Sequence, residues 1–538
     1  MPHKPSEEQA AIYDHTGGSK VKNTKIIAFA GAGKTTTLKG IAKTRRKDWG
    51  IYLTFNRSNA DEAKEKLTGT RCNAFSMHQV AFRAQRDTIG RPQNFRANDI
   101  RQSGVFSKFA LPVMRGWTDF RVASAVIRTM SEFANSASSD FAIEHAQAAL
   151  ISSVGDPDFI RDPEKKEEAA AVIARLSGPL VQMAEWFWLD SARNNNFSHD
   201  MYLKMLDLDT DLRRKAFNAY SYLMVDEAQD LNPVQRSIIE KSGIPIIAVG
   251  DPYQQIYSWR GAENALNKIS GETFYLTQSF RFGENIAEVG RQLLAARPDG
   301  GPEQRLTGAG SGHANGHEGS LVAHICRTNM GVIEDSLSLM EKGKDVYVDN
   351  IGSLLVDLRS AQALFDGNMR EVKSEELRHF NSWDELEMEA DEGNGTMERI
   401  RRIITAEMLP KIEGLASKQS DKPKAKTITL CTAHRSKGME WPGVRLGSDW
   451  KNLDEMHARY VGAKKKSEKH VTLAMEEFNA LYVAGTRAIS RLVGHEKLLE
   501  RKPEDPILAH HKANTGVPDD YTPTDMSDER KGPSIRTL

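Results

Sequence analysis

The chain has 538 residues, enough for three to four domains at about 150 residues each. Hydrophobic residues make up 39% and charged residues 27%, as in ordinary soluble globular proteins, and lysine plus arginine equals aspartate plus glutamate at 73 each. This balance excludes a chain coated in basic charge, while a local basic groove for nucleic acid stays open.

The cysteines and the apolar runs indicate the cellular compartment in which the protein is expected. Cys72, Cys326 and Cys431 show no metal-ligand spacing and predict a reducing compartment without disulfides. No run approaches 18 apolar residues, and the N-terminus lacks a signal-peptide core. We therefore expect a cytoplasmic, nucleoid-associated protein with no membrane contact.

Strand-like and helix-like segments alternate along the first half, which is typical of an α/β fold with a parallel sheet. Between His78 and about Asn195 the pattern becomes helical and more polar, which predicts a helical insertion. The four strand candidates are Thr24–Ala30, Trp49–Phe55, Tyr220–Asp226 and Ile244–Val249.

The second half repeats this outline. Strand character returns at 320–329 and at Thr427–His434, and the stretch between them, 351–426, is mostly helical and charged. Leu473–Leu492 is helix-like. From Arg501 the chain is polar and proline-rich, and we predict that this tail is disordered.

A phosphate-binding loop is predicted between the first strand and the helix after it. In AFAGAGKTTT, Gly33 allows the backbone to approach a phosphate, Lys34 supplies charge, and the Thr35 hydroxyl can bind magnesium. The first position of the pattern is Ala28 rather than glycine. The alternative is a glycine-rich turn that binds no nucleotide.

Acidic and basic groups suited to phosphoryl transfer follow further along. In LMVDEAQD, Asp226 would hold magnesium and Glu227 would polarise the attacking water, although the same residues could simply begin a helix. Arg281 and Arg487 are candidate cations for a γ-phosphate, but each arginine taken alone is more typical of a protein surface.

Taken in order, these motifs resemble superfamily 1 helicases of the UvrD/Rep type, over about nine-tenths of the chain. Besides AGAGKT and VDEAQD, the matching segments include GDPYQQIYSWRGA, LTQSFR, TAHRSKGMEW and EEFNALYVAGTRA. The likeness is greatest to the helicase core of the F-box DNA helicases. Because Gln9 already resembles the adenine-reading Q motif, we expect no F-box before the core.

The resemblance implies two RecA-like P-loop parallel-sheet domains, each with a mainly helical insertion, that clamp ATP between them. The implied divisions are 1–80 and 196–283 for the first domain, 81–195 for its insertion, 284–350 and 427–500 for the second domain, 351–426 for its small insertion, and 501–538 for the tail.

The nucleotide site follows from the same resemblance, with Arg281 and Arg487 supplied by the second domain and Phe280 in place of an adenine-stacking tyrosine. Thr36 stands where UvrD-type relatives often carry arginine, which predicts a looser grip on adenine. The implied catalytic residues are Lys34, Glu227, Gln254, Arg281 and Arg487. The implied ATP-binding residues are Gln9, Ala30, Gly31, Ala32, Gly33, Lys34, Thr35, Thr36, Phe280, Gly438 and Glu440, with Thr35 and Asp226 on Mg²⁺.

Single-stranded DNA would cross both domains, where aromatic rings and cations are needed. Tyr257 and Trp259 are the leading stacking residues. The alternatives of a core aromatic for Trp259 or Phe55, and of a structural histidine for His78 or His434, stay open. The full DNA-binding set is Phe55, Asn56, His78, Tyr257, Trp259, Arg260 and His434.

The implied activity is that of an ATP-dependent DNA helicase that moves 3′ to 5′ on single-stranded DNA and unwinds duplex in repair or recombination. Its expected partners are single-stranded DNA, single-strand–duplex junctions, and recombinases or replication proteins, and it is expected to act as a monomer. One alternative is a translocase that strips recombinase filaments from DNA with little unwinding. Another is an ATP-gated DNA-binding subunit without turnover.

Overall fold

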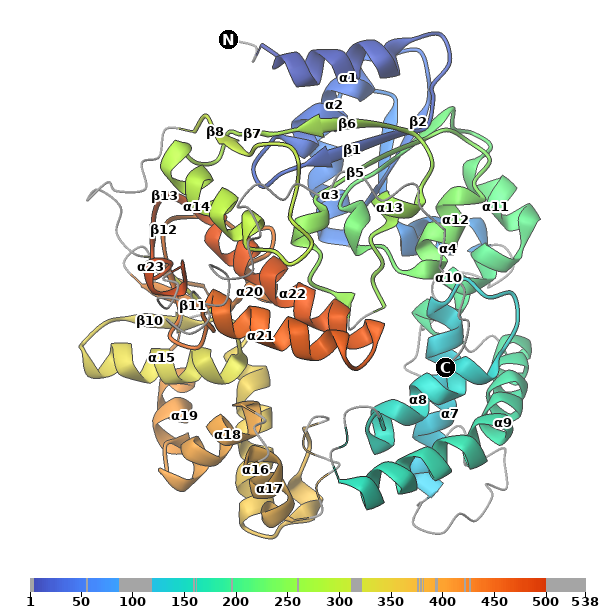
Figure 1. The fold of residues 1–538 in the computed structure, drawn as a ribbon. Coiled ribbons are helices and arrows are strands. Elements are labelled where there is room, and N and C mark those ends of the chain that lie inside the picture. Colours follow the sequence, from blue (N-terminus) through green and yellow to red (C-terminus); the bar gives the residue numbers. More distant parts are fainter. Residues whose placement is uncertain are drawn as a thin grey trace, which may run out of the picture.

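Six parallel strands form the first sheet, in the order β3-β2-β4-β5-β1-β6 (Figure 1). The computed structural model describes residues 4–54, 57–86, 119–157, 160, 162–194, 197–258, 261–310, 322–374, 377, 380, 382–391, 395–419, 422–424 and 427–499. The strands of this sheet are β1 Thr24–Ala28, β2 Gly50–Thr54, β3 Cys72–Ser76, β4 Tyr222–Val225, β5 Ile246–Gly250 and β6 Glu272–Leu276.

The central strands read as continuous apolar runs because both faces of the sheet are covered. In β4, Tyr222 and Met224 enter one buried cluster, whereas Leu223 and Val225 enter another on the opposite face. This alternation is the period of two that a strand imposes on its side chains. The predicted α/β class with parallel sheets is confirmed.

Helices cover both faces of the first sheet. Helices α1 and α2 lie together on one side of it, and α4, α10 and α12 pack with α7 in the cluster on the other (Figure 1). The helices of this half are α1 Glu7–Gly17, α2 Lys34–Thr44, α3 Arg57–Lys66, α4 Met77–Ala84, α7 Asp119–Asn135, α8 Ile143–Val154, α9 Pro163–Arg193, α10 His199–Leu208, α11 Thr210–Phe217, α12 Pro233–Glu240 and α13 Ala265–Lys268.

The second sheet has five parallel strands in the order β10-β11-β9-β12-β13. Its strands are β9 Ala323–Cys326, β10 Val346–Val348, β11 Ile428–Thr432, β12 Trp441–Leu446 and β13 Ala488–Val493, and a small pair, β7 Gln278–Ser279 and β8 Thr307–Gly308, lies between the sheets in sequence. The helices of this half are α14 Glu284–Ala295, α15 Asn329–Glu341, α16 Ile351–Phe365, α17 Trp383–Asp391, α18 Gly395–Thr405, α19 Leu409–Lys418, α20 Ala433–Ser436, α21 Leu453–Lys464, α22 Glu468–Gly485 and α23 Glu496–Leu499.

One predicted element is wrong at its end. The helix-like reading of Leu473–Leu492 holds only to Gly485, where α22 stops, and the residues from Ala488 form strand β13. The run YVAGTRAISRLV is apolar and short, so its periodicity does not separate a helix from a buried strand.

The two helical insertions stand on the lower right and lower left of Figure 1, as α7–α9 and α16–α19. These helices fall inside the predicted insertions, whose boundaries stay predictions, and the predicted tail 501–538 lies outside the described residues. Within the described parts of the chain, no helix is both long enough and apolar enough to span a bilayer.

The two sheets share a core at the junction between them. Phe29 and Ala30, which follow β1, pack in the same buried cluster as Leu481 and Val483 of α22. Ile256, which follows β5, joins them. The end of the first sheet is therefore packed directly against a helix of the second half.

A buried lysine ties the first insertion to the first sheet. Lys204 of α10 is fully buried and donates to the carbonyls of Ser136 (2.9 Å) and Ser138 (2.6 Å) and to Asp207 (3.2 Å). Burial lowers the pKa of Lys204. Asp207 also accepts from the half-exposed Lys241 at 2.9 Å.

We predict that Lys204→Met lowers the free energy of unfolding by about 3 kcal/mol, because it leaves buried acceptors without their donor. Lys241→Met is the matched control on the same carboxylate and should cost about 1 kcal/mol or less, because water can replace its ammonium. Urea denaturation of both variants measures the difference. Equal costs would show that burial of Lys204 contributes nothing.

Candidate nucleotide and nucleic-acid site

The loop between β1 and α2 has the backbone of a phosphate cradle. Gly31 and Gly33 have φ of 73° and 81°, a region that disfavours other residues. A Cβ on Gly31 would lie 2.5 Å from Ser279 Oγ, so the loop also needs glycine for space. Gly33 begins α2, whose first amides point towards the loop and favour an anion.

A partly buried ion pair stands beside this loop. Lys34 Nζ lies 2.8 Å from Glu227 Oε1. Burial opposes the charge of Lys34, but Glu227, Asp226 and Asp251 outweigh it and raise the pKa of Lys34. Burial likewise opposes ionisation of Glu227, yet the charges of Lys34 and Lys437 bring its pKa to about 2. Both groups are therefore charged at neutral pH.

Glu227 is also held in an uncommon backbone conformation. Its φ of 53° places a non-glycine residue in the left-handed region, which costs of the order of 1 kcal/mol and is found most often at functional sites. Gln229 Nε2 donates to Glu227 Oε2 at 2.6 Å. The carboxylate is thus aimed by its own strained backbone and by a neighbouring amide.

The acids around Lys34 suit a divalent cation. Asp226 accepts from the hydroxyl of Tyr52 at 2.5 Å, and burial together with the charge of Glu227 raises the pKa of Asp226. Burial also raises the pKa of Asp251 to about 6. This negative charge would be relieved by a cation, and a carboxylate with a threonine hydroxyl is a fitting set for Mg²⁺, which completes its shell with phosphate and water. Asp226 therefore fits the predicted metal role, and the role of Thr35 stays a prediction.

Two arginines stand at this place: Arg487 comes from the second half, whereas Arg281 follows β7 and lies beside Gly31 of the loop. Arg487 is 2% exposed and donates to Gln254 Oε1 at 3.0 Å and to the Val483 carbonyl at 2.9 Å. Burial and the nearby charge of Arg281 lower the pKa of Arg487 to about 9. Arg281 donates to Glu440 at 2.8 Å. A negative group placed between the two guanidinium groups would relieve their repulsion.

Two of the predicted ATP-binding residues, Gln9 and Phe280, lie close to Gly33. Gln9 is buried and donates to Thr37 Oγ1 at 3.1 Å. Gln9 Nε2 would lie 3.4 Å from a Cβ on Gly33, and a ring carbon of Phe280 would lie 3.8 Å from it. Thr36 is exposed, Ala32 is buried, and Gly438 has a φ of 87°. Glu440, also a predicted ATP-binding residue, is about half-exposed and forms an ion pair with Arg281.

Helix α22 contacts the loop after β5 at two points. Glu476 accepts from the Ser258 amide at 3.0 Å and from its hydroxyl at 2.5 Å. One turn later, Asn479 donates to the Gln255 carbonyl at 2.8 Å. Both contacts were missed from the sequence because they join residues more than 200 positions apart.

The same helix reaches the phosphate cradle two turns further on. The hydroxyl of the buried Tyr482 accepts from the Ala30 amide at 3.4 Å, and Arg487 follows just past the end of the helix. Glu476, Asn479 and Tyr482 are spaced by three residues and share one helical face. Helix α22 therefore joins the phosphate end of the junction to Ser258.

Lys437 is a further residue that was not predicted from the sequence. Its ammonium donates to Asp230 (2.6 Å) and to the Gln254 carbonyl (2.6 Å), and it lies 5.0 Å from the ring centre of Tyr257. Burial raises the pKa of Asp230 to about 6 despite this ion pair. The only sequence signal for Lys437 was its place inside the motif TAHRSKGMEW.

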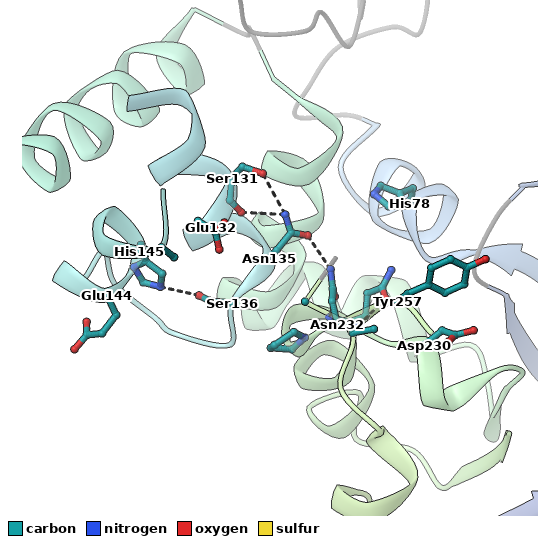
Figure 2. Close-up of a pocket in the computed structure, with 15 residues that line it drawn as sticks. His78, Ser131, Glu132, Asn135, Ser136, Glu144, His145, Asp230, Asn232 and Tyr257 are labelled. Carbon is teal, nitrogen blue, oxygen red and sulfur yellow. Dashed lines mark hydrogen bonds between the residues drawn. The ribbon is translucent and has the colours of Figure 1, made fainter. Parts of the chain in front are cut away.

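A pocket of about 640 Å³ opens beside Tyr257, between α7, α8 and the start of α12 (Figure 2). Figure 2 shows His78 and Tyr257 on one side of it and Asn135, Ser136 and His145 on the other. Burial lowers the pKa of His78, so a neutral ring faces the pocket. Rings and amides of this kind suit nucleobases better than phosphates.

The predicted DNA-binding residues are only partly brought together. Tyr257 and His78 line the pocket, and His434 accepts the Tyr257 hydroxyl on its carbonyl at 3.2 Å, with the two rings 6.0 Å apart. Four further candidates, Phe55, Asn56, Trp259 and Arg260, lie outside the described residues. Their roles stay predictions.

The cradle, the Lys34–Glu227 ion pair and the two parallel sheets define a P-loop protein with two α/β halves. Residues 6–271 match the model of the UvrD/REP helicase N-terminal domain, and residues 188–494 match that of the UvrD-like helicase C-terminal domain. The chain belongs to the UvrD-like helicase family.

Curated relatives share most of this chain. It is 28% identical over 519 residues to F-box DNA helicase protein 1 of Schizosaccharomyces pombe, covering 87% of this chain and 55% of that protein. It is 26% identical over 527 residues to F-box DNA helicase 1 of Gallus gallus, covering 92% and 49%. DNA helicase IV of Escherichia coli is 23% identical over 334 residues, covering 51% and 45%. The chain thus spans about half the length of these relatives.

The pH dependence of folding stability tests the environment of His434. Burial and the charge of Arg327 lower its folded pKa to about 4, so the unfolded chain binds a proton more readily. Stability contributed by the neutral ring is present above about pH 6.5 and is lost as pH falls through about 4, by up to about 1.4 kcal/mol per pH unit. Urea denaturation of His434→Asn should show a shallower loss than wild type. An unchanged slope would mean that His434 is not desolvated.

Proposed function

We propose that this chain is an ATP-dependent DNA helicase that moves 3′ to 5′ along single-stranded DNA and separates duplex in repair or recombination. The observation that carries the proposal is the contact of Arg487 with Gln254, at 3.0 Å, beside the Lys34–Glu227 pair. A cation from the second half thereby meets the phosphate cradle of the first, which is the arrangement that phosphoryl transfer requires.

Each residue has a role in this proposal. The cradle amides and Lys34 bind the β- and γ-phosphates, and Arg281 and Arg487 stabilise charge that develops on the γ-phosphate. Glu227 accepts a proton from the attacking water, which its pKa of about 2 permits only once Lys34 has turned to phosphate. Asp226 and Thr35 would hold Mg²⁺, which neutralises phosphate charge when bound.

Movement along DNA would follow from the contacts across the junction. Binding of a γ-phosphate gives Arg487 and Gln254 a shared partner and draws the two halves together. Helix α22 carries that change to Ser258 and hence to Tyr257, which faces the pocket. Alternate tightening and loosening at Tyr257 would let the protein step along a strand.

The choice of DNA draws support from the names of the relatives, whereas the direction of movement rests on the resemblance of the motifs. Both F-box relatives and DNA helicase IV carry the words DNA helicase in their names. We further propose that the chain acts as a monomer at single-strand–duplex junctions in the cytoplasm, with recombinases or replication proteins as partners. The three buried thiols suit such a reducing compartment.

Lys34→Ala should abolish ATP turnover, by about 100-fold or more, because it removes the cation at the phosphates. Lys39→Ala, on the same helix, is the matched control and should hydrolyse ATP like the wild type. Phosphate release in the presence of oligo(dT) measures both. Turnover retained in Lys34→Ala would overturn the assignment of the cradle.

The substrate and polarity are tested together. ATPase activity should rise with single-stranded DNA more than with RNA of the same sequence, and a 3′-tailed duplex should be unwound in preference to a 5′-tailed one. Stimulation by RNA alone, or preference for the 5′ tail, would contradict the proposal. Stimulation without any unwinding would favour a translocase that clears proteins from DNA.

Glu476→Gln tests the link through α22. The amide can no longer accept from both Ser258 donors, so DNA should stimulate the ATPase less, by about fivefold, while ATPase without DNA stays within about twofold of wild type. The ratio of the two rates, measured at saturating oligo(dT), reports this. Ser258→Ala should give the same loss, and a fall in both rates by one factor would point to a role in folding only.

A further inference from the structure

Helices α21 and α22 pack as an antiparallel hairpin whose tip is rich in lysine. Lys464, Lys465 and Lys466 are all exposed there, and Glu468 is the one acid between Lys464 and Lys469. The ammonium of Lys464 lies 4.9 Å from the ring centre of Tyr460. In a chain of zero net charge, this is a local concentration of positive charge beside an aromatic ring.

The tip is held in a fixed place. In Figure 1 the hairpin projects from the second sheet towards α7 and α8, and Lys469 forms an ion pair with Asp156, just beyond α8, at 3.1 Å. The charge of Lys469 also acts on Glu132, which lines the pocket beside Tyr257. Lys469 therefore lies near the pocket, and Lys464, Lys465 and Lys466 precede it at the same tip of the hairpin.

Helix α22 sets the distance from the tip to the DNA-facing loop. Lys469 and Glu476 are seven residues apart, so about 10 Å of helix separates them. Glu476 holds Ser258, the neighbour of Tyr257. A strand that leaves the ring of Tyr257 can thus reach the lysines within a few nucleotides.

The pocket and the tip have complementary chemistry. The described lining of the pocket carries three acids, Glu132, Glu144 and Asp230, together with amides and rings. The amides and rings suit bases, and the acids repel phosphates. The tip carries ammonium groups, which bind phosphates without regard to sequence. Together they supply both halves of what sequence-independent binding of a single strand needs.

We propose that Lys464, Lys465 and Lys466 bind the phosphate backbone of the single strand as it leaves the pocket beside Tyr257. The inference rests on the proposed function and extends it to a surface outside the motifs that carry the family resemblance. The tip thereby keeps hold of the strand while the contacts at Tyr257 loosen and tighten.

The test is the triple substitution Lys464→Ala, Lys465→Ala and Lys466→Ala, which leaves the Lys469–Asp156 pair in place. The matched control is Lys43→Ala, Arg46→Ala and Lys47→Ala, which removes the same charge from exposed positions at the end of α2, distant from the hairpin in Figure 1. Fluorescence anisotropy of labelled oligo(dT) is measured over a range of salt concentrations.

Each phosphate contact contributes about 0.7 to the slope of log affinity against log salt for a single strand, so the hairpin variant should lose about 2 from that slope and bind about tenfold more weakly at low salt. The control should match the wild type. The DNA concentration for half-maximal ATPase should rise in the hairpin variant, with the maximal rate unchanged.

Three outcomes would overturn the inference: wild-type slope and affinity in the hairpin variant, equal losses in the control, or a loss seen only with duplex DNA. Failure of the proposed function looks different. In that case the wild-type chain itself shows no ATPase stimulation by single-stranded DNA, whatever the lysines do.

Discussion

The junction between the two sheets buries charged groups, and two of them, Arg487 and Lys437, are held by hydrogen-bond acceptors that the opposite half supplies. Arg487 meets Gln254, and Lys437 meets Asp230, in positions that are almost closed to water. Removing one partner of such a pair leaves a buried charge that costs several kcal/mol. The relative position of the two halves is therefore tied to the state of a few charges, and a bound phosphate changes that state directly.

Helix α22 links these charged groups to the loop of Tyr257. It contacts the phosphate cradle through Tyr482 and the loop of Tyr257 through Glu476, with a single stretch of rigid helix between them. Packed cores and helices switch between discrete arrangements rather than deforming gradually. Under the proposed function, α22 passes a shift at the phosphate cradle to the loop of Tyr257, and beyond it to the lysine tip of the hairpin.

Local sequence patterns were enough to predict the strands and the motifs. The apolar runs before Asp226 and Gly250 are buried strands, and the glycines of the cradle do need positive φ. Two limits are physical. The strand that begins at Ala488 follows α22 closely, and both segments are rich in apolar residues. Hydrophobic periodicity therefore does not show where the helix ends and the strand begins. Glu476 and its partner Ser258 are 218 residues apart, and no local pattern reports a contact made only by folding.

The central claim is that the nucleotide and DNA sites are coupled through this junction, and reciprocal binding tests it most directly. Affinity for oligo(dT) is measured with and without a non-hydrolysable ATP analogue, and affinity for the analogue with and without oligo(dT). Coupled sites must change each other's affinity by the same factor, which we expect to be about 5- to 150-fold. A factor of one in both directions would contradict the account.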